Sequence, residues 1–203
     1  MKKYSISFKK VLFPLSLTML IFSGMLSSCN NASKPEDTKK VAEEHNDAKF
    51  NGATNEKDAQ FLVNAAEINS EEMNLGKLAQ VKSKNKDVKA LGAALEAEHV
   101  KMNMTLSLLA GKKQVTIPMS ETNKTMSDSA ALSTKSGAAF DKAYCDMMVA
   151  GHKNAVSIFE KASENGTDQD IKDFAANALV MLRAHLDKAL VCQAACEKMD
   201  KMK

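Results

Sequence analysis

The sequence has few residues of the kinds on which nucleic-acid-binding proteins rely. It has no tryptophan, only 2 tyrosines and 8 phenylalanines in 203 residues, and a formal net charge of +3. Four lysines within the first ten residues account for this positive charge, so the rest of the chain sums to −1. Binding of nucleic acids depends on basic surfaces and on stacking aromatic side chains. We therefore expect no nucleic-acid partner.

The sequence also lacks the signatures of strands and of common catalytic sites. No segment alternates apolar and polar residues for long enough to indicate a strand. There is no Gly-x-Ser-x-Gly elbow, no P-loop and no Gly-x-Gly-x-x-Gly motif. Pro35 and Pro118 both lie in polar linkers, so neither interrupts a periodic segment. These absences favour an all-α protein with a binding or structural role over an enzyme.

The first 28 residues have the layout of a bacterial lipoprotein signal peptide. A lysine-rich start precedes an apolar core over residues 11–22, which is too short to remain as a membrane span. The sequence then continues Leu26-Ser27-Ser28-Cys29, which resembles the lipobox whose cysteine receives a diacylglyceryl group. We predict cleavage before Cys29 and a membrane anchor of lipid on that residue. The residue after the cysteine is Asn30, whereas an aspartate at this position is linked to retention in the inner membrane of some bacteria. The outer membrane is therefore favoured. An ordinary signal peptide with an incidental cysteine is the alternative.

The remainder of the chain divides into a polar stretch and a periodic region. Residues 29–55 are rich in Asn, Asp, Glu and Lys, which predicts a flexible tether after the lipidated cysteine. In residues 56–200 apolar side chains recur at steps of three and four, which indicates helices. Four such segments are expected, at about residues 56–83, 86–110, 137–164 and 168–199.

Short polar turns join these segments in pairs. Each pair is therefore expected to form an antiparallel helical hairpin. Residues 112–136 would be a long crossover between the two hairpins, with room for a minor helix near residues 127–132. The predicted architecture is a four-helix bundle.

Four titratable residues interrupt the apolar stripes, one on each predicted helix. They are Glu72, His99, His152 and His185. At a rise of 1.5 Å per residue, their offsets from the predicted turns differ by only about 4–8 Å, so all four lie near the middle of the bundle. Imidazole nitrogens and carboxylate oxygens from several helices can bind iron, manganese, zinc or copper. The sequence therefore predicts a transition-metal site.

Three more residues are candidates for the same site. Glu96 precedes His99 by three residues and forms a Glu-x-x-His unit, and Asp141 and Tyr144 are secondary candidates. The alternative is a buried polar network, with the histidines hydrogen-bonded to Glu72, Glu96, Tyr144 or backbone, inside a non-catalytic structural or interaction module. An oxidative enzyme that uses the bound metal is the third hypothesis.

Three strings in these helices resemble a known family. They are Glu71-Glu72-Met73-x-Leu75-Gly76-x-Leu78-Ala79, Phe140-Asp141-x-x-Tyr144-x-x-Met147-Met148-x-x-x-His152 and Leu182-x-x-His185-Leu186. They are similar to the domain-of-unknown-function family 4142 of predicted periplasmic and outer-membrane bacterial proteins, over about residues 58–189. The resemblance implies a ferritin-like four-helix bundle without an established activity.

Ferritin-like di-iron proteins use a Glu-x-x-His unit in each half of the bundle. Here the second half has Leu182 in the place of that glutamate, and His152 stands where a further glutamate is expected. The pattern therefore supports a mononuclear or histidine-rich site.

Apart from Cys29, the chain has three cysteines, at positions 145, 192 and 196. In an oxidising compartment this odd number leaves at least one thiol free, and a Cys145–Cys192 bridge is one arrangement. Cys192 and Cys196 lie one helical turn apart, which suits a shared ligand better than a disulfide. With Met199 they form a set of soft donors that would select copper(I). The alternative is that these residues only fill the core.

Overall fold

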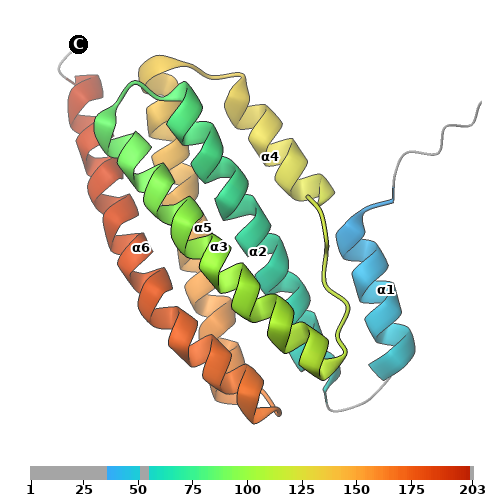
Figure 1. Cartoon of the computed structure of the whole chain (residues 1–203). Helices are drawn as coiled ribbons and strands as arrows, with labels where there is room; N and C mark the ends of the chain where they lie inside the picture. Colours follow the sequence, from blue (N-terminus) through green and yellow to red (C-terminus); the bar gives the residue numbers. More distant parts are fainter. Residues whose placement is uncertain (1–35, 51–54, 202–203) are drawn as a thin grey trace, which may run out of the picture. The chain divides into compact units, whose positions relative to one another are not determined.

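In the computed structural model, residues 36–50 and 55–201 are described, and helices are the only regular secondary structure in this part of the chain. The predicted signal peptide and Cys29 lie outside these residues. The helices are α1 (Thr38–Phe50), α2 (Glu56–Lys82), α3 (Lys86–Lys113), α4 (Asn123–Ser133), α5 (Gly137–Asn165) and α6 (Gln169–Lys201). The expectation of an all-α fold is confirmed, and α2, α3, α5 and α6 are the four expected segments (Figure 1).

The four long helices pack as two hairpins. α2 packs mainly on α3, and α5 mainly on α6, while α2 against α5 and α3 against α6 join the hairpins. The four run side by side in Figure 1, an arrangement compatible with the predicted four-helix bundle. α4 lies in the expected crossover and covers the predicted minor helix. Within the described residues, no helix is long and apolar enough to cross a membrane.

Polar side chains define where the helices begin. Asn85 accepts a hydrogen bond from the backbone N–H of Asp87 at 2.9 Å, and this cap starts α3. Thr122 caps α4 through the N–H of Thr125 at 3.2 Å. Such caps satisfy N–H groups that have no partner inside the helix, so a short polar turn is enough to restart a helix.

A pair of glycines lets α2 and α3 approach closely. A Cβ atom on Gly76 would lie 2.7 Å from the carbonyl oxygen of Gly92, and a Cβ on Gly92 would lie 2.8 Å from that of Gly76. No side chain fits at either position without moving a helix. The first hairpin therefore depends on glycine at both positions.

The prediction of a flexible tether over residues 29–55 is wrong for Thr38–Phe50, which forms α1. This helix buries Ala42, Asn46 and Phe50, which are spaced by four residues and share one face. The Asn46 amide donates to the carbonyl of Thr116 and its oxygen accepts from the Thr116 N–H, both at 2.8 Å. The polar composition concealed this face, because one of its three buried residues is an asparagine.

The core consists of two apolar clusters separated by a layer of histidines. One cluster includes Leu106, Phe159 and Leu182, and the other includes Leu95 and Met148. On α3, α5 and α6 a histidine stands in sequence between the residues of the two clusters. The fold thus places one polar layer at a defined height inside an otherwise apolar bundle.

Candidate metal centre

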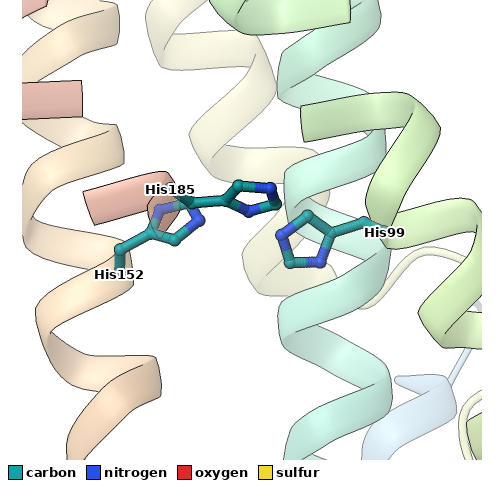
Figure 2. Close-up of side chains that lie close together, drawn as sticks. All are labelled: His99, His152 and His185. Carbon is teal, nitrogen blue, oxygen red and sulfur yellow. The ribbon is translucent and has the colours of Figure 1, made fainter. Parts of the chain in front are cut away.

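Three histidine side chains meet inside the bundle, each from a different helix. His99 lies on α3, His152 on α5 and His185 on α6, and all three are 0% exposed. The ring centroids are 5.2 Å apart for His99–His185, 5.3 Å for His152–His185 and 5.8 Å for His99–His152. Each ring offers a nitrogen within 4.8 Å of a nitrogen of both others. Figure 2 shows the three rings gathered at one point between the helices.

One nitrogen of each ring is held by a hydrogen-bond acceptor outside the group. His99 Nδ1 lies 2.8 Å from the side-chain oxygen of Asn69, and His152 Nδ1 lies 2.9 Å from the backbone oxygen of Met148. His185 Nε2 lies 2.9 Å from a carboxylate oxygen of Glu98. Each of these oxygens accepts a hydrogen bond, so in the neutral ring the held nitrogen carries the N–H.

The remaining nitrogen of each ring is buried and has no hydrogen-bond partner among the described residues. These atoms are His99 Nε2, His152 Nε2 and His185 Nδ1. In the neutral tautomers set by the outer partners, each carries a lone pair. A buried polar atom without a partner is costly, so three of them in one place require an explanation.

Burial keeps the three rings neutral. Desolvation lowers the pKa of His99 well below its usual value, and the neighbouring His185 and His152 lower it further. Desolvation lowers the pKa of His152 to about 4. The pKa of His185 is also lowered, mainly by burial, although the Glu98 carboxylate acts in the opposite direction. Neutral imidazole is the form that coordinates a metal.

Glu72 of α2 lies beside the histidines but not between them. Its Oε1 is 3.5 Å from Nδ1 of His152, the outer nitrogen, and its Oε2 has no hydrogen-bond partner within the described part of the chain. Gly151 makes room for it, because a Cβ there would lie 3.1 Å from Oε1. Burial raises the pKa of Glu72 well above its ordinary value, and the charge of Glu71 adds to this. In the absence of a nearby cation the carboxyl group is therefore favoured in its neutral form.

The other predicted oxygen ligands have different partners or none, and they are not part of the three-histidine group. Glu96 does not belong to the group of converging ring nitrogens, and its carboxylate accepts a 2.6 Å hydrogen bond from Gln80 at the α2–α3 interface. Asp141 accepts a 2.6 Å hydrogen bond from Ser83. Tyr144 is fully buried, and neither it nor Asp141 belongs to the group of converging ring nitrogens.

Sequence reasoning missed Asn69 and Glu98, the partners of the outer nitrogens. Glu98 directly precedes His99, about 100° around the helix, and from there it reaches His185 on α6. Glu96, three residues before His99, instead faces α2, where Gln80 donates to it. Asn69 lies three residues before Glu72 on the inner face of α2, but an asparagine is not titratable, so the pattern of titratable residues does not include it.

A second group of possible ligands consists of thiols. Cys145, Cys192 and Cys196 are buried and free, and their Sγ atoms all lie within 4.8 Å of one another. The predicted soft donor Met199 is 43% exposed, so it stands outside this buried group.

Comparisons with known proteins bring no activity to this site. A family model described as a domain of unknown function, DUF4142, matches residues 43–191. The match covers more than half of the chain, includes all three histidines and ends directly before Cys192. Neither the curated proteins nor the solved structures contain a match to this chain.

Proposed function

This chain belongs to the DUF4142 family, and we propose that it binds a transition-metal ion through His99, His152 and His185. The observation that carries the proposal is the orientation of the rings. Each outer nitrogen is held by an oxygen, and each remaining nitrogen is buried without a partner among the described residues. Metal-binding histidines have this pattern, since an outer acceptor fixes the tautomer and leaves the other nitrogen for the ion.

The spacing of the rings suits a single ion. Nitrogens bound at 2.0–2.1 Å to one tetrahedral ion are about 3.4 Å apart. One nitrogen of each ring lies within 4.8 Å of one nitrogen of both others, so a closure of about 1.4 Å or less brings three nitrogens to this distance. Three imidazoles favour zinc or copper over manganese, which prefers oxygen ligands. A fourth position would remain for water or another small ligand.

The surroundings can balance the charge of the ion. Three neutral imidazoles bring no charge, so a divalent cation would be a buried double charge. Glu98 faces the outer nitrogen of His185, and Glu72 faces that of His152. A cation in the group would favour the ionised form of Glu72 and so lower its raised pKa. Two carboxylates just outside the three ligands would then compensate the two charges.

The second candidate function is a non-catalytic structural or interaction module whose histidines form only a buried polar network. In a network of this kind, every buried polar atom should have a hydrogen-bond partner. Here three ring nitrogens and one oxygen of Glu72 have no hydrogen-bond partner in the described residues. Metal binding accounts for the three nitrogens, so it is the better supported function.

The proposal includes a fold type. The two long hairpins and the crossover are consistent with a ferritin-like arrangement.

The proposal also includes a place in the cell. The lipobox-like string before Cys29 supports a lipid anchor in the bacterial envelope, with the outer membrane favoured. Replacement of Cys29 by serine should move the protein from the detergent phase to the aqueous phase of a phase-separating detergent. A Cys29→Ser protein that stays in the detergent phase would contradict the anchor.

Metal analysis of the purified full chain tests the central proposal. The protein is loaded separately with zinc and with copper(II), passed through a desalting column and measured by elemental analysis. We expect one more ion per chain in the wild type than in a His99→Ala/His152→Ala/His185→Ala variant. His45→Ala is the matched control, because His45 is an exposed histidine of α1. Equal metal in the wild type and the triple variant, or none in either, would overturn the proposal.

A further inference from the structure

The three buried thiols form a layer of their own in the bundle. Cys145 precedes His152 by seven residues on α5, and Cys192 follows His185 by seven on the antiparallel α6. Seven residues are two helical turns, so the thiol layer lies about 10 Å along the bundle from the histidines. Cys196, one turn beyond Cys192, completes it. The thiols are therefore too far away to share an ion with the three rings.

We propose that Cys145, Cys192 and Cys196 bind copper(I) as a three-coordinate thiolate site. This site is independent of the function proposed for the histidines. The ion enters as copper(I) and stays copper(I), the sulfur atoms bind it as thiolates, and the thiol protons pass to solvent. No oxidant or reductant takes part.

The geometry of the sulfur atoms fits a three-coordinate ion. Sulfur atoms bound at about 2.3 Å to one ion lie about 3.8 Å apart in a tetrahedral arrangement and about 4.0 Å apart in a trigonal plane. The Sγ atoms of Cys145 and Cys196 are 3.8 Å apart, and all three lie within 4.8 Å of one another. Cys192 and Cys196 are each 5% exposed, which gives an ion a short route from the surface.

Burial and neighbouring groups shift the pKa values of the three thiols in different directions. The contact with Cys145 lowers the pKa of Cys192, whereas burial and the carboxylates of Asp87 and Asp141 act on it in the opposite direction. Burial raises the pKa of Cys196 to about 11, and the contact with Cys192 together with burial raises the pKa of Cys145. A metal ion removes this obstacle, since it binds the deprotonated sulfur directly.

The donor set selects copper(I) over zinc. Thiolates are soft ligands and favour soft ions. Zinc in structural sites takes four ligands, and no histidine, aspartate or glutamate joins the three thiols within the described residues. A monovalent ion that accepts three ligands matches the group as it stands. A disulfide between Cys145 and one of the other two cysteines is the competing state in an oxidising compartment.

An anaerobic copper(I) titration of the reduced full chain tests the proposal. Copper(I) is presented as a complex with a chromophoric chelator, and its transfer to the protein is followed by the loss of chelator colour and by the ultraviolet thiolate-to-copper absorption. The His99→Ala/His152→Ala/His185→Ala variant should still take up one equivalent with the same absorption. Cys145→Ser should lose both signals, and Cys29→Ser, which changes the remaining cysteine, should keep both. This comparison separates the thiol site from the histidine site.

Other outcomes would overturn the proposal. They are equal copper uptake by Cys145→Ser and the wild type, displacement of the copper by an equal amount of zinc, or a Cys145 disulfide in protein isolated from the envelope without reductant. If Cys145→Ser does not fold, thiol alkylation of the wild type followed by mass spectrometry replaces it. Copper(I) should then protect Cys145, Cys192 and Cys196 together, and alkylation of all three at the same rate with and without copper would also refute the site.

Discussion

The side-chain oxygen of Asn69 lies 2.8 Å from Nδ1 of His99, and both residues are completely buried. α2 is the one long helix that contributes no histidine to the group, yet it faces two of the rings. Asn69 holds His99, and Glu72 lies against the outer nitrogen of His152. Three helices thus supply the proposed ligands, and the fourth supplies groups that orient them.

Removal of an outer partner should weaken metal binding without removing a ligand. Asn69→Ala and Glu98→Ala should each lower the affinity for zinc by about 10–100-fold, because the freed ring can rotate or take the other tautomer. Glu96→Ala is the control, since Glu96 bonds to Gln80 instead of a histidine. Competition with a chromophoric zinc chelator measures all three. An unchanged affinity in both Asn69→Ala and Glu98→Ala would show that the outer contacts do not position the rings.

Acid should destabilise the metal-free protein through its buried histidines. Between pH 6.5 and about 4 the unfolded chain binds a proton at His152 and the folded protein does not, so stability falls as the pH falls. For His152 alone this window corresponds to about 3 kcal/mol. The pKa values of His99 and His185 are lowered as well, so these residues act in the same direction.

Glu72 opposes this effect, because its pKa is raised. There is a pH range above 4.5 in which Glu72 is protonated in the folded protein but ionised in the unfolded chain. In this range the folded state binds the extra proton, so acid favours the folded state through Glu72. Urea unfolding of the metal-free protein at several pH values should therefore show a steeper loss of stability with acid in Glu72→Gln than in the wild type. Parallel pH profiles for the two proteins would contradict the burial of an un-ionised Glu72.

A methyl group between α2 and α3 should push these two helices of the first hairpin apart. Gly76→Ala should reduce the free energy of unfolding by about 1–3 kcal/mol, because its Cβ would meet the backbone of α3. Gly111→Ala is the matched control within α3, since a Cβ there meets nothing within 4 Å. Better helix propensity should make Gly111→Ala more stable by up to about 1 kcal/mol. Denaturant midpoints that move equally for both variants would refute the close contact.

The attachment of α1 should depend on Asn46. Asn46→Ala removes two hydrogen bonds to the backbone of Thr116. The N–H and C=O groups of Thr116 then lack the Asn46 side chain as a partner. The expected cost is about 1–3 kcal/mol. His45→Ala, an exposed neighbour on the same helix, should change stability by no more than about 0.5 kcal/mol. Hydrogen exchange of α1 would show the loss directly, and unchanged protection in Asn46→Ala would mean that this pair does not hold the helix.

The sequence by itself was sufficient for the long helices and for the height of the three histidines. Both follow from the spacing of apolar residues, because each stripe at steps of three and four carries one histidine near its middle. Helical rise then converts sequence offsets from the turns into heights along the bundle. The common height of His99, His152 and His185 is therefore a property of the amino-acid sequence.

Only the tertiary structure decided the lateral contacts. Periodicity places a residue on a face but does not specify which neighbour that face meets, so it assigns Glu96 to the site and misses Glu98. The same limit concealed α1, whose Asn46 is buried only because the backbone of Thr116 comes to meet it. Which nitrogen of each ring finds a hydrogen-bond partner, and the meeting of Cys145 with Cys192 and Cys196, likewise depend on how the helices pack. Spacing along one chain sets height and face, whereas partners across a bundle are set by the packing of one helix against another.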